Sequence, residues 1–359
     1  MQFRAACAII RSEIEKEMKS LKKILMITTG GTIASREGVN GLAPSLSPEE
    51  LLSYIPKVKE ICEVDTLEAC HLDSTNITPQ HWQILSRAIE KNYNAYDGFV
   101  ICHGTDTLAY TAAALSYMVQ NSRKPIVITG AQKPIDTDVT DAKTNLIDSF
   151  IYASDPYSQN VSIVFDGKVI VGTRARKERT KSFDAFSSLN YPFTAVIVDG
   201  MLVRYIEERE IEGEVAFYHN MCDNLCTLKM IPGMKPDILS YLFENYDCIV
   251  IESFGVGGIP QNMTEAFYRE MQKWAGKGKY VVMTTQIAKE GSHMTVYEVG
   301  KRVKRDFNLI ESYEMSFEAT ITKLMWILGL GECDYDVMRE RFYTQINHDI
   351  LFTQRIENE

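Results

Sequence analysis

The sequence alternates short runs rich in Ile and Val with longer segments of helical character. Each run ends near a Gly, a Thr or a polar turn, and the clearest are KKILMITTGG, YDGFVICHGTD, KPIVITGAQ, VSIVFDG and TAVIVDG. A strand that is apolar along its whole length needs cover on both faces, and the helices that connect parallel strands provide that cover. The alternation therefore predicts an α/β protein built on a mostly parallel, doubly wound sheet.

A polar stretch interrupts this alternation between residues 203 and 226, where RYIEEREIEGEVAFYHNMCDN has no sustained period. The alternation resumes with LKMIPG, YDCIVIESFGVGGIP and KYVVMTTQ. We therefore expect a larger N-terminal α/β domain at 21–205, a linker at 206–225 and a smaller C-terminal α/β domain at 226–359. Residues 1–20 are expected to form an extension, a frayed charged helix to which we assign no function.

Helix ends carry local signals of their own. Ser47-Pro48-Glu49-Glu50 combines a capping Ser, a Pro at the first helical position and a Glu three residues after the Ser, and Thr78-Pro79 repeats the first two features. We expect helices to begin at both places. Further helices are expected at Leu108–Val119 and around Ala319–Leu330.

The composition excludes several classes of protein. Lys and Arg total 38 against 48 Asp and Glu, a formal net charge of −10, and no basic cluster is present, so we expect no nucleic-acid partner. No apolar run reaches the ~18 residues of a membrane span, and residues 1–20 lack the pattern of an export signal. The eight cysteines include no C-x-x-C pair, which favours a reducing, cytoplasmic setting and no metal site.

The first candidate for chemistry is the segment Thr28-Thr29-Gly30-Gly31-Thr32, directly after the first predicted strand. Two adjacent glycines let the chain turn sharply and expose backbone N–H groups. The turn lies at the carboxyl edge of a parallel sheet, where open α/β folds bind ligands. A plain tight turn explains the segment equally well on its own. The segment matches neither of the glycine-rich phosphate-binding motifs.

The second candidate is His103-Gly104-Thr105-Asp106-Thr107, which follows the buried run at Gly98–Cys102. It places Thr105 and Asp106 at a helix N-terminus on the same sheet edge as Thr32. A carboxylate at this position is stabilised by the helix dipole and can hold a ligand ammonium group. The simpler interpretation is that Thr105 or Asp106 only caps the helix. His103 is expected to be a buried, hydrogen-bonded core residue rather than a base.

Two further segments present polar side chains after strands. Asp73-Ser74-Thr75 supplies clustered hydroxyls that can bind a carboxylate, or that only form an Asx or ST turn. Lys177, in GTRARK, looks in isolation like a solvated surface lysine. The sequence lacks G-x-S-x-G and H-E-x-x-H, so a hydrolase of this kind needs Thr as its nucleophile. A Thr hydroxyl is weak without a neighbouring base, which a partly desolvated lysine can provide.

Taken together, these motifs resemble the bacterial type I (cytoplasmic) L-asparaginases, within the asparaginase/glutaminase family. The resemblance runs from about Lys22 to the C-terminus and depends on the order and spacing of six segments. These are TTGGTIAS, LDSTNITP, YDGFVICHGTDTLAYTAAALSYM, GTRARKERTKSFDAFSSLNYP, IESFGVGGIPQN and EATITKLMWILG. The resemblance implies a flavodoxin-like N-terminal domain and a smaller C-terminal α/β domain.

The resemblance also implies an activity and roles for individual residues. The reaction is hydrolysis of L-asparagine to L-aspartate and ammonia, without metal or cofactor. Thr32 matches the nucleophile that forms an acyl-ester, and Thr105, Asp106 and Lys177 match the second catalytic group. Asp106 and Thr105 also match substrate-binding positions. The remaining substrate-binding positions, which would hold the α-carboxylate, are Asp73, Ser74 and Thr75.

The sequence departs from the family pattern at three positions. Many relatives carry a tyrosine on a mobile lid ten residues after the nucleophile, and the matching residue here is Leu42. Some type I enzymes bind asparagine at an allosteric site through an arginine and a cysteine, whose positions here hold Glu252 and Ile287. A carboxylate opposes a carboxylate ligand, so we expect this allosteric site to be absent or altered.

Other functions remain open at this stage. Inside the family, the alternative is the amidase subunit of an archaeal-type Glu-tRNA amidotransferase, which carries an extra N-terminal module. Outside it, a dinucleotide-binding oxidoreductase shares the sheet pattern but would need G-x-G-x-x-G, and a non-catalytic amino-acid sensor would keep the fold. The family resemblance implies a homodimer or homotetramer. We expect Ser253–Pro260 to reach the neighbouring subunit's site.

Overall fold

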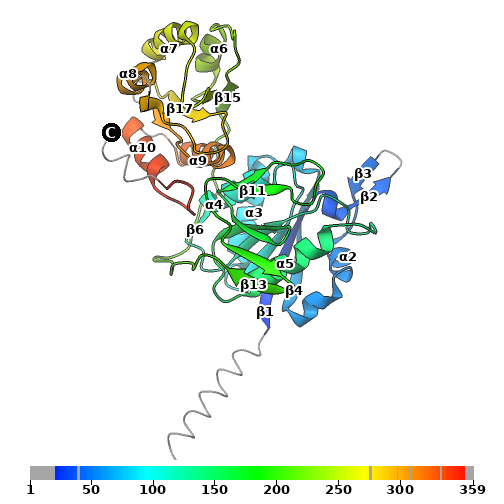
Figure 1. Cartoon of the computed structure of the whole chain (residues 1–359). Coiled ribbons are helices and arrows are strands. Elements are labelled where there is room, and N and C mark those ends of the chain that lie inside the picture. The colour runs from blue at the N-terminus through cyan, green and yellow to red at the C-terminus, as the bar shows by residue number, and fades with distance from the viewer. Residues whose placement is uncertain are drawn as a thin grey trace, which may run out of the picture.

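The computed structural model describes residues 21–38, 41–274, 277–296, 298–307, 309–331 and 334–351. The expected extension at 1–20 lies outside these ranges. Figure 1 shows two α/β bodies, a larger one from the first part of the chain and a smaller one from the last part, with α9 (Phe317–Gly329) at their boundary. Within the described ranges, no helix has both the length and the apolar character that a membrane span requires.

The N-terminal body is built on one eight-stranded sheet with the order β13-β12-β9-β8-β7-β5-β1-β4. Five of its strands are parallel: β4 (Cys62–Leu72), β1 (Lys22–Gly30), β5 (Gly98–Cys102), β7 (Ile126–Thr129) and β8 (Val161–Phe165). The other three extend the sheet in antiparallel fashion: β9 (Lys168–Val171), β12 (Ala195–Val198) and β13 (Met201–Arg204). The predicted mostly parallel sheet is confirmed.

The antiparallel part has a local cause in two hairpin turns. Asp166 and Gly167 join β8 to β9 with φ of 51° and 67°, and Asp199 and Gly200 join β12 to β13 with φ of 51° and 74°. Asp-Gly pairs in the left-handed region favour tight two-residue hairpins whose twist matches the flanking strands. The chain therefore reverses directly at these places instead of crossing over through a helix.

Helices cover both faces of this sheet. Alternate residues of β1 enter opposite cores, with Ile24 and Met26 on one face and Leu25 and Ile27 on the other. The first face is covered by α2 (Pro48–Ser53) and α5 (Ala142–Ser154), and the second by α3 (Pro79–Asn92) and α4 (Leu108–Met118). The predicted start of α2 is confirmed, because Ser47 and Glu50 form a reciprocal capping box.

The C-terminal body is a four-stranded parallel sheet covered by helices. Its strands are β15 (Leu225–Lys229), β16 (Cys248–Ser253), β17 (Tyr280–Thr285) and β18 (Ile310–Glu311). Its helices are α6 (Ile238–Asn245), α7 (Gln261–Trp274), α8 (Glu298–Phe307), α9 and α10 (Tyr335–Tyr343). The helix expected from Ala319 begins two residues earlier, at Phe317, because the Ser316 side chain accepts the N–H of Ala319.

The two bodies are joined by more than the polar stretch. Within the expected linker 206–225, β14 (Ala216–Phe217) pairs with β6 (Val119–Gln120) of the N-terminal body. Helices α4 and α9 pack together, and the rings of Tyr117 and Trp326 stack with centroids 6.1 Å apart. The boundary is therefore a shared apolar core rather than a flexible connection.

Candidate active site

Three loops meet at the carboxyl edge of the large sheet. Gly31, after β1, has φ 79°, and a Cβ built on it would lie 2.4 Å from the backbone of Gly104, after β5. A Cβ on Gly104 would in turn lie 2.6 Å from the Ser74 hydroxyl oxygen, after β4. The loops can approach one another this closely only because both positions are glycines, which have no side chain. They place the loops of Thr32, Ser74 and Thr105 directly against one another.

Thr32 is the first residue of the short 3₁₀ helix η1 (Thr32–Ala34), and it is half-buried. The turn before it is fixed by the N–H of Gly31, which donates to the Leu72 carbonyl at 2.9 Å, and by the Ser35 hydroxyl, which donates to the Gly31 carbonyl at 2.9 Å. Among the described residues, no group hydrogen-bonds to the Thr32 hydroxyl. A hydroxyl held on a rigid turn without a protein partner is available to a substrate.

Lys177 connects to both residues of the second motif. Its Nζ donates to Thr105 Oγ1 at 2.7 Å and to Asp106 Oδ1 at 2.7 Å. Thr105 is 5% exposed and the Lys177 side chain 15% exposed, whereas the Asp106 side chain is 58% exposed. The interpretation of Lys177 as a solvated surface lysine is wrong, because its side chain is largely buried and is hydrogen-bonded to the protein. Both partners lie more than seventy residues away in the sequence.

Neither Thr105 nor Asp106 caps the following helix, so that simpler interpretation is also wrong. The N-cap residue of α4 is Thr107, and no side chain makes a capping hydrogen bond there. Instead, the Thr107 hydroxyl donates to the Ser74 carbonyl at 2.7 Å, and the Asp106 N–H donates to the Ser74 hydroxyl at 3.3 Å. These bonds fasten the Ser74 loop to the start of α4.

The Asp73–Thr75 segment forms a turn, as the simpler of its two interpretations predicted. Asp73 Oδ1 accepts both the N–H and the hydroxyl of Thr75 at 2.8 Å, an Asx turn at the start of η3 (Ser74–Asn76). Asp73 and Thr75 are exposed and Ser74 is buried. The turn therefore places the Ser74 hydroxyl beside Asp106, while a substrate-binding role for it stays a prediction.

His103 is a core residue, as predicted. It is fully buried, with Nδ1 2.7 Å from the Gly104 carbonyl and Nε2 2.9 Å from the Thr111 hydroxyl. Burial lowers its pKa to about 4, so the ring is neutral near pH 7. Its hydrogen bonds hold the backbone at Gly104 rather than serving a reaction.

Gln132 is a site residue that the sequence patterns did not reveal. It follows β7, and its Oε1 accepts the Thr105 hydroxyl at 3.3 Å while its Nε2 donates to the carbonyls of Arg179 and Ser182 at 3.1 Å. The Gln132 backbone N–H donates to Asp141 Oδ2 at 2.9 Å. The only sequence signal was a polar residue directly after a buried strand, in KPIVITGAQ. Gln132 thus ties Thr105 to the loop that follows Lys177.

Comparison with known proteins decides the family. The model of the asparaginase N-terminal domain matches residues 23–210, and the model of the glutaminase/asparaginase C-terminal domain matches residues 224–342. The chain belongs to the asparaginase family. It is therefore related to amidohydrolases, and the four residues Thr32, Thr105, Asp106 and Lys177 lie within the N-terminal asparaginase domain.

Relatives of this asparaginase-family chain include L-asparaginase from Thermococcus kodakarensis, 38% identical over 309 residues, which cover 86% of this chain and 93% of that protein. The solved structure of the T. kodakarensis L-asparaginase superposes with a TM-score of 0.85 at 35% identity, over 92% of this chain and 99% of that one. L-asparaginase 1 from Escherichia coli K12 is 32% identical, over 89% of this chain and 95% of that protein. A glutamyl-tRNA(Gln) amidotransferase subunit from Pyrococcus furiosus is also 32% identical, over 89% of this chain and 74% of that protein.

The departures from the family pattern lie in two places. Leu42 lies in β3 (Gly41–Pro44), which forms a hairpin with β2 (Ser35–Gly38) directly after η1, and its side chain is outside what the structure describes. Glu252 is half-buried near the end of β16, and Ile287 is 55% exposed. Between them, Gln286 donates to the carbonyl of Glu252 at 3.0 Å. An altered allosteric site in this asparaginase-family protein stays a prediction.

Within the described residues, no three His, Cys, Asp or Glu side chains gather as a metal site requires. The polar groups at the sheet edge are instead hydroxyls, the carboxylates of Asp73 and Asp106, the Gln132 amide and the Lys177 side chain. This set suits proton transfer and the binding of a small zwitterion.

Proposed function

We propose that this protein is an L-asparaginase, which hydrolyses L-asparagine to L-aspartate and ammonia through an acyl-ester on Thr32. The observation that supports it best is that Lys177 hydrogen-bonds to Thr105 and Asp106, whose loop packs directly against that of Thr32. A nucleophile, a proton-transfer group and an anionic binding group at one sheet edge are what amide hydrolysis needs.

The charges of the site match the charges of free asparagine. The exposed Asp106 carboxylate uses Oδ1 for Lys177, and we assign its second oxygen to the substrate ammonium group. The Ser74 hydroxyl accepts the Asp106 N–H and keeps its own proton, and we assign this proton, together with the Asp73–Thr75 turn, to binding the α-carboxylate. With both ends held, the side-chain amide of the substrate points towards Thr32.

The reaction then proceeds in two steps. Thr32 Oγ attacks the amide carbon, the new C–O ester bond forms, the C–N bond breaks, and the nitrogen leaves as ammonia with the proton taken from the hydroxyl. Water then attacks the ester, which releases aspartate and returns the proton to Thr32. We assign the proton transfers to Thr105, supported by Lys177 at 2.7 Å. A positioned group of this kind contributes ~10²–10⁴-fold to the rate.

Both steps place negative charge on the former carbonyl oxygen. The Gly31 N–H already donates to the Leu72 carbonyl, so we assign the stabilisation of that charge to other backbone N–H groups of the glycine turn and to the backbone near Thr105. Losing one such donor typically raises the barrier by ~3–4 kcal/mol. Because the donors are main-chain groups, this contribution depends on loop geometry rather than on side-chain identity.

The test is ammonia release from L-asparagine by the purified chain and by Thr32→Ala. The substitution removes one hydroxyl and one methyl from a half-buried turn, so we expect an unchanged melting temperature and ammonia release at background. Acid quenching followed by mass spectrometry of the peptide containing Thr32 should show an aspartyl ester in the unsubstituted chain. Ammonia release by Thr32→Ala at a rate near that of the unsubstituted chain would overturn the proposal.

A tRNA-dependent amidotransferase subunit is the second candidate, because the P. furiosus protein of that name is as similar as the E. coli L-asparaginase. The match covers 74% of that relative and 95% of the E. coli enzyme. Turnover of free asparagine by the purified chain alone supports asparaginase activity. Ammonia release only from glutamine, with a partner subunit and glutamyl-tRNA present, would support the amidotransferase instead.

A further inference from the structure

The C-terminal segment Thr344–Leu351, which we call the strap, lies against the N-terminal body. Its tip is a tight turn in which the Asp349 N–H donates to the Ile346 carbonyl at 3.0 Å. The two central residues, Asn347 and His348, have φ of 46° and 58°. A turn with two residues in the left-handed region is sharply bent and exposes their carbonyl groups. In Figure 1 this segment follows α10 and runs towards the N-terminal body near β6.

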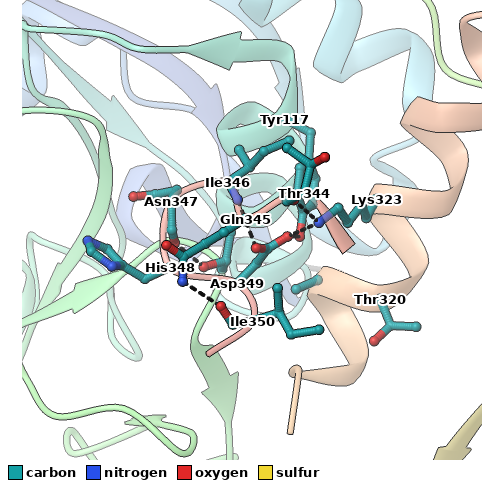
Figure 2. Close-up of polar contacts among 12 residues, drawn as sticks. Tyr117, Thr320, Lys323, Thr344, Gln345, Ile346, Asn347, His348, Asp349 and Ile350 are labelled. Atoms are coloured by element: carbon teal, nitrogen blue, oxygen red, sulfur yellow. Dashed lines mark hydrogen bonds and ion pairs between the residues drawn. The ribbon is translucent and has the colours of Figure 1, made fainter. Parts of the chain in front are cut away.

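A fully buried ion pair holds the strap from one side. Asp349 Oδ2 accepts from Lys323 Nζ at 2.6 Å and from the Tyr117 hydroxyl at 3.0 Å, and all three side chains are 0% exposed. Lys323 also donates to the Thr344 carbonyl at 2.7 Å. Figure 2 shows these groups converging on the strap from α4, which carries Tyr117, and α9, which carries Lys323. The strap is thus bonded to helices of both bodies at one point.

A second set of bonds holds the strap to the segment before Lys177. The Thr173 hydroxyl donates to the Asn347 carbonyl at 2.6 Å, and Arg174 Nε donates to the His348 carbonyl at 2.6 Å. Arg174 is itself 0% exposed, and its guanidinium donates to the carbonyl of Glu314 at 3.1 Å and to the Glu314 carboxylate at 3.3 Å. A guanidinium with several fixed acceptors leaves its backbone little freedom.

Lys177 depends on this anchor because its strand is not part of the large sheet. Strand β10 (Ala175–Lys177) pairs with β11 (Phe186–Ser188) in a separate two-stranded sheet, and it begins directly after Arg174. A two-stranded unit of three residues per strand is not stable by itself. Its place relative to Thr105 must therefore come from contacts outside the pair. Ala175 and Phe186 pack in the apolar core beside α4, and the Thr173–Arg174 end, which sets where β10 begins, is bonded to the strap.

We propose that the strap positions the Lys177 ammonium group for the reaction at Thr105, with Asp349, Thr173 and Arg174 as positioning residues. The catalytic consequence rests on the proposed asparaginase function; the geometric consequence does not. A misplacement of about 1 Å in a reacting group can cost ~10²-fold in rate. Loosening the strap should therefore lower kcat and leave KM nearly unchanged. The Asp73–Thr75 turn is fastened to the start of α4, and the Asp106 oxygen assigned to the substrate is not the one that binds Lys177.

Two variants loosen the strap at different points. Asp349→Asn keeps the shape of the side chain but leaves the buried Lys323 without its counter-charge. Thr173→Val keeps the volume and removes the single hydroxyl that reaches the Asn347 carbonyl. The second variant serves if the first does not fold, because it leaves no buried charge unpaired. The matched control is Asp334→Ala, which removes the side-chain cap of α10 and lowers stability without touching the strap.

The first readout is steady-state kinetics with L-asparagine, beside the melting temperature of each variant. We expect kcat to fall roughly 10–100-fold in Asp349→Asn, and by a smaller factor in Thr173→Val, with KM within about 2-fold. Asp334→Ala should lower the melting temperature and keep kcat. A kcat that falls in proportion to the melting temperature in all three variants would overturn the positioning role.

The second readout is the crystal structure of Thr173→Val, and of Asp349→Asn where it folds. We expect Lys177 Nζ to lie beyond hydrogen-bond distance of Thr105 Oγ1, against 2.7 Å in the unsubstituted chain. An unchanged distance in a folded variant would overturn the inference whatever the activity. If the unsubstituted chain releases no ammonia from asparagine, the proposed function fails by itself, and this distance still decides the geometric claim.

Discussion

At the scale of single residues, the site depends on a hydroxyl that has two neighbours. The Thr105 hydroxyl lies 2.7 Å from Lys177 Nζ and 3.3 Å from Gln132 Oε1. It has one proton, so while it donates to Gln132 it accepts from Lys177. For Thr105 to take a proton from a substrate or water, its own proton has to pass on to a neighbouring group, and Lys177 Nζ at 2.7 Å is closer than Gln132 Oε1. Thr105 and Lys177 therefore act as one unit.

This coupling predicts non-additive kinetics. Thr105→Val and Lys177→Met should each lower kcat by ~10²–10⁴-fold. The kcat of the double variant should be no lower than that of the less active single variant. The measurement is a double-mutant cycle on kcat for ammonia release from asparagine. Lys181→Met, which removes the same charge from an exposed position nearby, is the control and should keep kcat. Effects that multiply in the double variant would show that the two residues act independently.

At the scale of elements, the site depends on the close approach of two strand ends. Gly31→Ala would place a Cβ 2.4 Å from the backbone of Gly104, so the two loops must move apart. We expect ammonia release to fall by at least ~10²-fold, because the loops carry Thr32 and Thr105. Gly200→Ala is the matched control, since φ is +79° at Gly31 and +74° at Gly200 but nothing lies within 4 Å of the Cβ at Gly200.

Both glycine variants carry the strain of a side chain at positive φ, about 1 kcal/mol or more. Comparing their activities at matched temperatures below both melting points isolates the effect of loop separation. Equal activity in the two variants would mean that the approach of Gly31 to Gly104 does not matter to the reaction.

Helix α5 carries a buried carboxylate with a measurable effect on stability. Asp148 is 6% exposed, and burial, together with the nearby charge of Asp166, raises its pKa from 3.8 to about 6. Between these values the folded protein holds a proton that the unfolded chain releases, so stability falls as pH rises through this window. Above pH 6 the cost is fully present. A shift of this size corresponds to up to about 3 kcal/mol.

Asp148→Asn should therefore raise the free energy of unfolding at pH 8 by up to about 3 kcal/mol. The gain should shrink from pH 6 downwards and vanish below about pH 4. Urea unfolding at four or five pH values measures it. Asp199→Asn, which removes one charge from an exposed turn, should give no such pH dependence. A constant gain at all pH values would point to a steric cause instead.

Local patterns in the sequence predicted much of the fold and part of the site. The apolar runs at β1, β5, β7, β8 and β12 and the capping box at Ser47 depend on neighbouring residues, and all are present. The edge strand β4 was not predicted, because it mixes polar and apolar residues and buries little of its length. Without the family resemblance, Lys177 looked like a surface residue and Gln132 was not noticed. Their contacts with Thr105 span 72 and 27 residues, and no local pattern encodes them.

At the scale of the whole molecule, the two bodies share one core across their boundary. Ala113 and Tyr117 of α4 pack in the same apolar cluster as Leu324 and Ile327 of α9. The strap adds buried charges that cannot meet water unless this boundary opens, and a buried charge that loses its partner costs several kcal/mol. Separate unfolding of either body would expose both the cluster and the ion pairs. The boundary thus favours joint unfolding, although two-domain proteins often unfold in steps.

We therefore expect a single cooperative transition in urea, reported by one buried thiol in each body. Cys102 in β5 and Cys248 in β16 are free cysteines with 0% exposure, and pulse labelling with mass spectrometry follows each one separately. Both should become reactive over the same range of urea concentration. Leu324→Ala, in the shared cluster, should cost ~2–5 kcal/mol and shift both labelling curves together. Met263→Ala, in the outer core of the C-terminal body, is the control for a cavity away from the boundary. Labelling of Cys248 well before Cys102 in the unsubstituted chain would mean that the C-terminal body opens alone, and that the strap does not couple the two bodies.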